Sequence, residues 1–298
     1  MCSQETLFQD LEARAFAQHL QRRDDSHKGD AGNVLIIGGA HGMSGGLLLA
    51  GLGALYCGAG LVRLGMLDRH SAHVSAAHPE LMIHDISDEN PESWINSNPA
   101  DVIAIGPGLG QNESAKQWLR SAIKHKGPLI VDADALNILA SHRTLLSRMK
   151  LRQFPTVLTP HPGEAARLLS NDNNVVQSDR LAALKHLIQI SHSIVVLKGQ
   201  HTLVGALERI PQRCLAGNAG MATGGMGDVL TGIISALCSQ GIRQQVGVWE
   251  ATCLGVQLHA AAGDQLADSG IGPIGMTASE LVLAARSLLN KASSASII

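Results

Sequence analysis

The stretch VLIIGGAHGMSGGLLLAGLGALYC, residues 34–57, has the pattern of a strand, a glycine-rich loop and a helix. Its first four residues are aliphatic, which is typical of a buried strand. The glycines that follow permit a tight turn, and the apolar run from Leu47 to Cys57 predicts a buried helix. Residues 45–62 lack charges, but their glycines and marginal length disfavour a membrane span.

The same alternation of short apolar runs and helical patterns continues along the chain. It predicts an α/β fold with a mostly parallel central sheet and helices on both faces. We find no repeat, low-complexity tract or linker, so we expect a polar N-terminal arm at 1–27 and one domain at 28–298. The predicted strands are Val34–Ile37, Leu61–Met66, Val102–Ile105, Leu129–Val131, Thr156–Leu158, Ile194–Leu197 and Thr202–Val204. The predicted helices are Leu47–Cys57, Glu113–Lys124, Glu164–Leu169, Asp179–Ile190, Gly227–Leu237, Val248–Leu266 and Ala278–Leu288.

Composition and charge exclude several classes of protein. The 298 residues are 45% hydrophobic but only 2% aromatic, so aliphatic side chains must fill the core. A formal net charge of -2 gives no general attraction to nucleic acid or to an anionic membrane. Five cysteines without a CxxC pair disfavour zinc ribbons and disulfide frameworks, and the N-terminus lacks the features of a signal peptide. A cytoplasmic location is therefore expected.

Five of the predicted strands are followed by glycine-rich or polar segments. In parallel α/β folds, ligands bind outside the carboxyl ends of the strands, and these ends share one edge of the sheet. The segments therefore predict a single binding site at that edge. They are GGAHGMSGG (38–46), GPGLGQ (106–111), DAD (132–134), TPHPGE (159–164) and KGQHT (198–202).

Each of these segments also has an ordinary structural interpretation. GGAHGMSGG lacks a GxGxxG pattern, which disfavours a Rossmann dehydrogenase. Asp132 ends a strand and could position magnesium-bound water, whereas Asp134 is expected to cap a helix beginning at Ala135. Two prolines hold His161 in one backbone geometry, and Glu164 falls in the first turn of a helix.

Lys198 and Asp228 have two interpretations each. Lys198 is either a phosphate contact or an exposed turn lysine. NAGMATGGMGDVLTGII (218–234) places Asp228 directly after Gly224-Gly225-Met226-Gly227. Converging N–H groups and a helix N-terminus at this loop favour a transferring phosphoryl group. A plain helix cap needs no such loop, so we interpret Asp228 as the base that accepts a proton from an attacking hydroxyl.

The full set of motifs resembles one family. These motifs are KGDAGNVLIIGG, GAGLVR, IGPGLGQ, VDADALN, TPHPGEAARLL, VVLKGQHT and NAGMATGGMGDVLTG. Together they resemble the ADP-dependent NAD(P)H-hydrate dehydratase family of the ribokinase-like superfamily, from about Lys28 to the C-terminus. The chain reads SGG at Gly46 where relatives commonly read SGA, and His161 replaces an asparagine of the vitamin-kinase branch.

The resemblance implies a repair enzyme. It would convert the S epimer of the hydrated cofactors NADHX and NADPHX to NADH and NADPH, with Mg²⁺ and with ADP or ATP as co-substrate. Asp228 takes the family's base position and also contacts the substrate. The remaining implied site residues are Gly46, Gly108 and His161 for the substrate, Lys198, Gly199, Gln200, His201, Thr202 and Gly227 for the nucleotide, and Glu164 for indirect metal contact.

The family also implies a homotetramer, and many of its members carry an epimerase domain ahead of this one. About 27 residues precede Lys28, so we expect either a separate epimerase as pathway partner or spontaneous epimerisation of the substrate. The alternative function is a ribokinase-like kinase of a small alcohol, such as a thiazole or pyrimidine vitamin precursor, which would release a stable phosphate ester. A nucleotide-binding regulator without turnover is disfavoured, because it has no use for Asp228.

Overall fold

The computed structural model describes residues 9–73 and 78–294 and contains a ten-stranded sheet. Seven neighbouring strands are parallel, in the order β8-β7-β6-β5-β2-β3-β4, and β9 and β1-β10 extend the sheet beyond β8. Antiparallel pairing joins β9 to both β8 and β10. The strands are β1 (Gln9–Asp10), β2 (Asn33–Gly38), β3 (Leu61–Met66), β4 (Met82–Asp85), β5 (Val102–Ile105), β6 (Leu129–Val131), β7 (Thr156–Leu158), β8 (Ile194–Leu197), β9 (Leu203–Gly205) and β10 (Gln212–Arg213).

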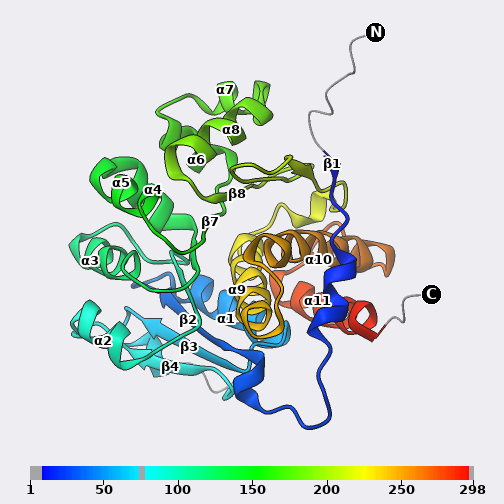
Figure 1. Ribbon diagram of the computed structural model, residues 1–298, viewed down its shortest axis with the longest axis horizontal. Helices are drawn as coiled ribbons and strands as arrows, with labels where there is room; N and C mark the ends of the chain where they lie inside the picture. The colour runs from blue at the N-terminus through cyan, green and yellow to red at the C-terminus, as the bar shows by residue number, and fades with distance from the viewer. Residues whose placement is uncertain (1–8, 74–77, 295–298) are drawn as a thin grey trace.

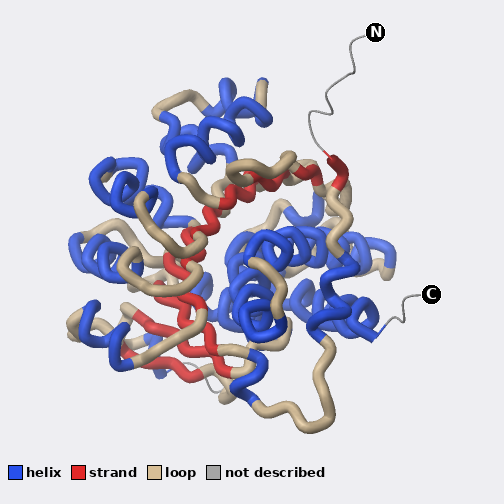
Figure 2. The backbone as a smooth tube through the Cα atoms, viewed as in Figure 1, coloured by secondary structure: helices blue, strands red, loops and turns tan. Residues whose placement is uncertain are grey.

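Helices cover both faces of the sheet (Figures 1 and 2). One layer is formed by α1 (Ser44–Tyr56), α9 (Met226–Gln244), α10 (Val248–Asp268) and α11 (Ala278–Ser294). The other layer is formed by α2 (Pro91–Ser97), α3 (Glu113–Ala122), α4 (Ala133–Ser141), α5 (Arg143–Lys150), α6 (Pro162–Leu169), α7 (Asn173–Ser178) and α8 (Arg180–Ser191). The predicted α/β architecture, mostly parallel with helices on both faces, is confirmed.

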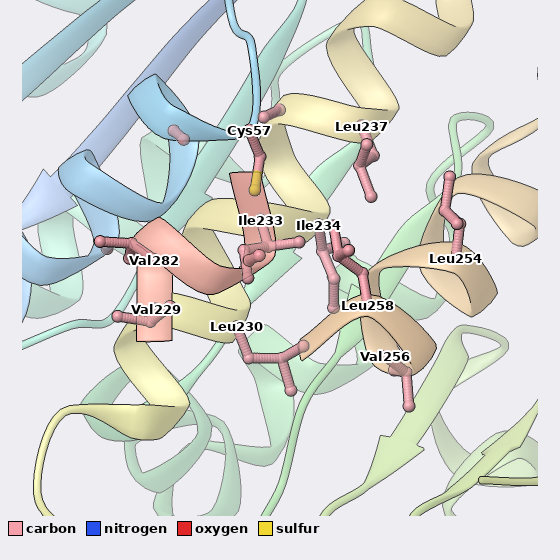
Figure 3. Close-up of a cluster of buried hydrophobic side chains, with 14 of the residues drawn as sticks. Cys57, Val229, Leu230, Ile233, Ile234, Leu237, Leu254, Val256, Leu258 and Val282 are labelled. Carbon is pink, nitrogen blue, oxygen red and sulfur yellow. The ribbon is translucent and has the colours of Figure 1, made fainter. Parts of the chain in front are cut away.

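Alternate residues of each central strand contribute to different cores, because successive strand side chains point to opposite faces. In β2, Val34 and Ile36 face the layer of α9, while Leu35 and Ile37 face the layer of α3. A strand that is buried on both sides explains the uninterrupted apolar run in the sequence. Figure 3 shows part of the first core, with Cys57 and aliphatic side chains of α9, α10 and α11.

Glycines bring α1 and α9 into close contact. A Cβ atom on Gly232 would lie 1.9 Å from the carbonyl oxygen of Ala50, and one on Gly53 would lie 2.5 Å from that of Val229. The two backbones can therefore cross only if both positions lack a side chain. The glycine-rich apolar stretch is thus a buried helix, as predicted, and no helix of the described residues is long and apolar enough to cross a membrane.

The N-terminal segment packs against the domain as far as the structure describes it. Gln9 and Asp10 pair with β10, and the 3₁₀ helix η1 (Arg14–Leu20) contacts α10 and α11. The Gln257 side chain accepts a hydrogen bond from the Ala13 amide (2.7 Å) and donates one to the Leu11 carbonyl (3.2 Å). The division at 27/28 stays a prediction.

Candidate functional site

The segments predicted to form one site meet at the carboxyl edge of the sheet. A cleft of about 370 Å³ lies there. It joins the beginnings of α1, α4 and α9 to the loop after β5 and to α6. Its lining residues are Met43, Gly46, Gly108, Ala133, Asp134, Asn137, Glu164 and Asp228.

The deepest charged pair of the site joins Lys198 to Asp132. Lys198 Nζ lies 2.8 Å from Asp132 Oδ1, and the Thr231 hydroxyl donates to Asp132 Oδ2 at 2.7 Å. The side chains of Asp132 and Lys198 are 1% and 18% exposed. Burial alone would lower the pKa of Lys198, but Asp132 and Glu164 outweigh it and hold the pKa above its usual value. Lys198 is therefore a buried cation of the site rather than an exposed turn lysine.

His161 and Glu164 form the N-terminal capping box of α6. His161 Nδ1 accepts a hydrogen bond from the Gly163 amide at 3.0 Å, and Glu164 Oε2 accepts one from the His161 amide at 2.8 Å. Glu164 thus falls in the first turn, as predicted. Burial raises the pKa of Glu164, Asp132 adds to this effect, and Lys198, 4.0 Å away, opposes it. His161 is half-exposed, and burial and the nearby Lys198 and Arg167 lower its pKa.

The glycine loop ends at the N-terminus of α9, with Gly225 at the cap position and Asp228 in the first turn. Asp228 is therefore not the cap residue. Burial raises its pKa to about 6, the Asp132 and Asp134 carboxylates act in the same direction, and Lys198 opposes them. A Cβ atom on Gly227 would lie 3.1 Å from Lys198 Nζ, so the loop and the ammonium border the same space.

The helix cap predicted for Asp134 is wrong. The helix α4 begins at Ala133, the cap position belongs to Asp132, and Asp134 lies in the first turn. Asp134 Oδ2 instead accepts a hydrogen bond from the Gly110 amide at 2.9 Å. The sequence could not show this, because Ala133 adopts a left-handed conformation with φ of 46° that alanine rarely takes. This turn starts the helix one residue after the strand-end Asp132.

The loop after β5 is fixed against the loop after β2. The Gly39 amide donates to the Pro107 carbonyl at 3.0 Å, and the Ala40 amide donates to the Gly108 carbonyl at 2.6 Å. A Cβ atom on Gly108 would lie 2.2 Å from the carbonyl oxygen of Met43, so only glycine fits there. The loop 198–202 continues the site at the next strand end, with Gly199, Gln200 and His201 exposed.

Gly46 in α1 offers a direct test of the Asp228 position. We expect Gly46→Val to lower kcat about tenfold while keeping the fold, because its Cβ atom would lie 3.2 Å from Asp228 Oδ2 and the two methyl groups beyond it would displace that carboxylate, whereas alanine adds only the Cβ atom. Gly45→Val is the matched control, since it lies in the same helix with no atom within 4 Å of its Cβ position. Steady-state kinetics and thermal melting of both variants check this. Equal kcat values would show that the Gly46 contact does not place Asp228.

Sequence reasoning missed two residues of this region. Thr231 contacts the site and Asn137 lines it, but each lies inside a predicted helix, where such side chains are common, whereas Met43 lies in the predicted segment 38–46. Thr231 had a signal in its spacing, because it follows Asp228 by three residues and so lies on the same face of α9. Among the described residues, no group of three or more His, Cys, Asp or Glu side chains could hold a metal ion by itself.

Comparisons with known proteins agree on one family. The model of the NAD(P)H-hydrate dehydratase family matches residues 34–285. A bifunctional NAD(P)H-hydrate repair enzyme of Escherichia coli (strain K12) is 42% identical over 97% of the chain, which spans only 54% of that relative's length. An ADP-dependent (S)-NAD(P)H-hydrate dehydratase of Neisseria meningitidis serogroup B is 40% identical over 91% of the chain and 89% of the relative.

A solved structure gives the same result for the fold. The ADP/ATP-dependent NAD(P)H-hydrate dehydratase from Bacillus subtilis, co-crystallized with ATP/Mg²⁺, matches with a TM-score of 0.82 and 27% identity. The match covers 96% of this chain and 99% of that one. The predicted ribokinase-like fold is thereby confirmed.

Proposed function

Because the chain belongs to the NAD(P)H-hydrate dehydratase family, we propose that it dehydrates the S epimer of NADHX or NADPHX with ADP or ATP as co-substrate. The observation that supports this most directly is the position of Asp228. Its carboxylate lines the cleft at the end of the glycine loop, beside the buried Lys198 ammonium. The comparisons give no support to the alternative, a kinase of a small alcohol.

In the proposed reaction, the ring hydroxyl of the hydrated cofactor attacks the terminal phosphorus of the nucleotide, and the bond from that phosphorus to the bridging oxygen breaks, which releases AMP from ADP or ADP from ATP. Asp228 accepts the hydroxyl proton, and the N–H groups at the start of α9 face the negative charge of the transferring phosphoryl group. Hydroxide is a poor leaving group, whereas phosphate is a good one. The ring nitrogen then donates its electron pair as phosphate leaves, and loss of a proton from the adjacent ring carbon restores the dihydropyridine.

The other predicted site residues take roles that fit their places. Gly46 and Gly108 line the cleft beside Asp228, where the hydrated ring would lie. His161 does not itself line the cleft, but its Nε2 atom lies 3.4 Å from Oε1 of Glu164, which does, and we assign His161 to the substrate on that ground. The nucleotide would extend along the loop formed by Lys198, Gly199, Gln200, His201 and Thr202, with Gly227 next to its terminal phosphate.

A magnesium ion fits this donor set. Magnesium usually takes one or two carboxylates and completes its shell with water and substrate phosphates. Glu164 is a buried carboxylate on the cleft, and Asp132 lies behind it. When bound, the ion would neutralise charge on the nucleotide phosphates. A homotetramer and a separate epimerase partner stay predictions of the family resemblance, and a cytoplasmic location stays a prediction from the cysteines and the N-terminal sequence.

The test is a mixture of the protein, NADHX, magnesium and either ADP or ATP. We expect the absorbance band of NADH to appear together with an equal amount of inorganic phosphate. A stable phosphate ester without the NADH band would establish the kinase alternative instead. Nucleotide binding without any product would indicate a regulator.

The pH dependence of kcat/KM should follow the protonation of the Asp228 carboxylate. A base must be unprotonated to act, and the pKa of Asp228 is raised to about 6, so we expect kcat/KM to rise with pH through about 6. Glu164 also has a raised pKa, so Glu164→Gln is the control. This variant should be less active but keep the same acidic limb. If the limb vanishes in Glu164→Gln, the titrating group is Glu164 and not Asp228.

A further inference from the structure

The guanidinium of Arg180, at the start of α8, lies beneath the loop 197–201 and binds its carbonyl groups. One terminal nitrogen donates to the carbonyls of Gln200 and His201, and the other donates to those of Leu197 (3.0 Å) and Lys198 (3.2 Å). A single side chain therefore fixes the orientation of four peptide groups in the loop.

This arrangement directs backbone N–H groups of the loop away from Arg180. In a trans peptide the C=O and N–H bonds point in opposite directions, so carbonyls that face Arg180 direct the N–H groups of Gly199, His201 and Thr202 away from it. The remaining carbonyl of the loop, that of Gly199, accepts a hydrogen bond from the Thr202 hydroxyl at 3.0 Å. Within residues 9–73 and 78–294, the N–H groups of Gly199 and His201 have no backbone hydrogen-bond partner, whereas that of Thr202 closes the turn 200–201 toward the Gly199 carbonyl.

The positive charge of Arg180 adds to the attraction of these N–H groups for an anion. Burial lowers the pKa of the guanidinium, and no carboxylate of the described residues forms an ion pair with it. Backbone N–H groups left unpaired on the outside of a loop attract an anion, and an unneutralised cation beneath them strengthens the positive potential. Gly199, with φ of +132°, permits the sharp turn, and a Cβ atom there would lie 3.2 Å from the guanidinium.

We propose that Arg180 is a positioning residue that holds the backbone N–H groups of Gly199 and His201 outward as a binding cluster for a phosphate group of the nucleotide. The inference rests on the proposed function only for the identity of the ligand. Lys198 connects the cluster to the glycine loop, because its backbone begins the loop and its Nζ reaches Gly227. The diphosphate group of one bound nucleotide would thus contact both the loop that begins at Lys198 and the glycine loop that ends at Gly227.

Arg152 provides a matched control at the opposite edge of the sheet. Its guanidinium also binds backbone carbonyls, those of Ile123, His125 (3.0 Å) and Gly127 (2.6 Å), in the loop that precedes β6. Burial lowers the pKa of Arg152 to about 10. The chemistry of the two arginines is therefore the same, but only Arg180 lies under a loop of the site.

The experiment compares Arg180→Lys with Arg152→Lys, because lysine keeps the charge but lacks the planar fork that binds several carbonyls. Titration calorimetry with ADP and with adenosine requires no turnover. For Arg180→Lys we expect the Kd for ADP to rise about tenfold and that for adenosine to change little. In kinetics, the KM for the nucleotide should rise while kcat at saturation stays within a few-fold. Arg152→Lys should lower the melting temperature and leave the Kd for ADP unchanged.

Two results would overturn the proposal: wild-type ADP affinity in Arg180→Lys, or an equal loss for adenosine, which has no phosphate. If Arg180→Lys does not fold, Arg180→Gln gives the same test, since its side-chain amide has only two N–H donors for the four carbonyls, and unchanged ADP affinity in it would be equally decisive. Normal ADP binding without dehydration of NADHX would overturn the proposed function and leave the role of Arg180 standing.

Discussion

Asp228→Asn is expected to lower kcat by about 10²–10⁴-fold, the usual contribution of a general base, and to leave nucleotide binding within a few-fold. The amide keeps the shape of the side chain but cannot accept the proton of the attacking hydroxyl. The wild-type carboxylate suits this task because burial raises its pKa to about 6, close to the working pH. Single-turnover kinetics and titration calorimetry with ADP measure the two effects separately.

The control for this variant is Asp134→Asn. Asp134 lines the same cleft, but it accepts a hydrogen bond from the Gly110 amide, which an asparagine oxygen can also accept. Its kcat should therefore stay within a few-fold of wild type. Near-normal turnover in Asp228→Asn would show that Asp228 is not the base. An equal loss of kcat in both variants would show that turnover depends on the negative charge of the cleft and not on one proton acceptor.

Lys198→Ala is expected to lower the free energy of unfolding by about 3–5 kcal/mol, because it leaves the buried Asp132 carboxylate without its cation. It should also weaken nucleotide affinity by about 1–3 kcal/mol through the loss of a charge-assisted hydrogen bond to phosphate. Thermal or urea unfolding measures the first effect, and calorimetry with ADP measures the second. Lys124→Ala, which breaks an exposed pair with Glu92, should change stability by less than about 1 kcal/mol.

A double variant separates the two effects of Lys198. In Lys198→Ala with Asp132→Asn, the buried charge is absent, so most of the stability should return. The nucleotide affinity should stay low, because the ammonium is still missing. If the double variant regains ADP affinity as well, Lys198 acts only through the fold, and its assignment to the nucleotide is wrong.

The sequence predicted the central sheet well because its strands are buried on both faces. Five predicted strands agree with the structure at both ends, among them Val102–Ile105 and Ile194–Leu197. The predicted Thr202–Val204 is displaced by one residue from β9, where a polar turn adjoins the strand. By contrast, β4 at the edge of the sheet was missed, because its residues Met82–Asp85 are only partly buried and include a histidine and an aspartate.

Helix positions were less predictable where the helices are short or begin in strained backbone. The helix α2 was missed although Asn90 caps it and Pro91 begins it, a signal that the sequence contained. The helix α9 extends seven residues beyond the predicted end at Leu237, because its buried face continues to Gly241. Side-chain partnerships such as Lys198 with Asp132 join strands far apart in sequence, and no spacing rule reveals them.

The residues of the site are anchored to parts of the molecule that differ in stiffness. Asp228 is carried by α9, where every residue from Val229 to Gly241 is buried, so the position of the base can change only if the core opens. Gly199, Gln200 and His201 are exposed. Amide hydrogen exchange in α9 should therefore occur only through global unfolding, whereas the 199–202 loop opens locally. The proton acceptor is thus held by the core of the protein, whereas the nucleotide segment is held in its conformation by one side chain, that of Arg180.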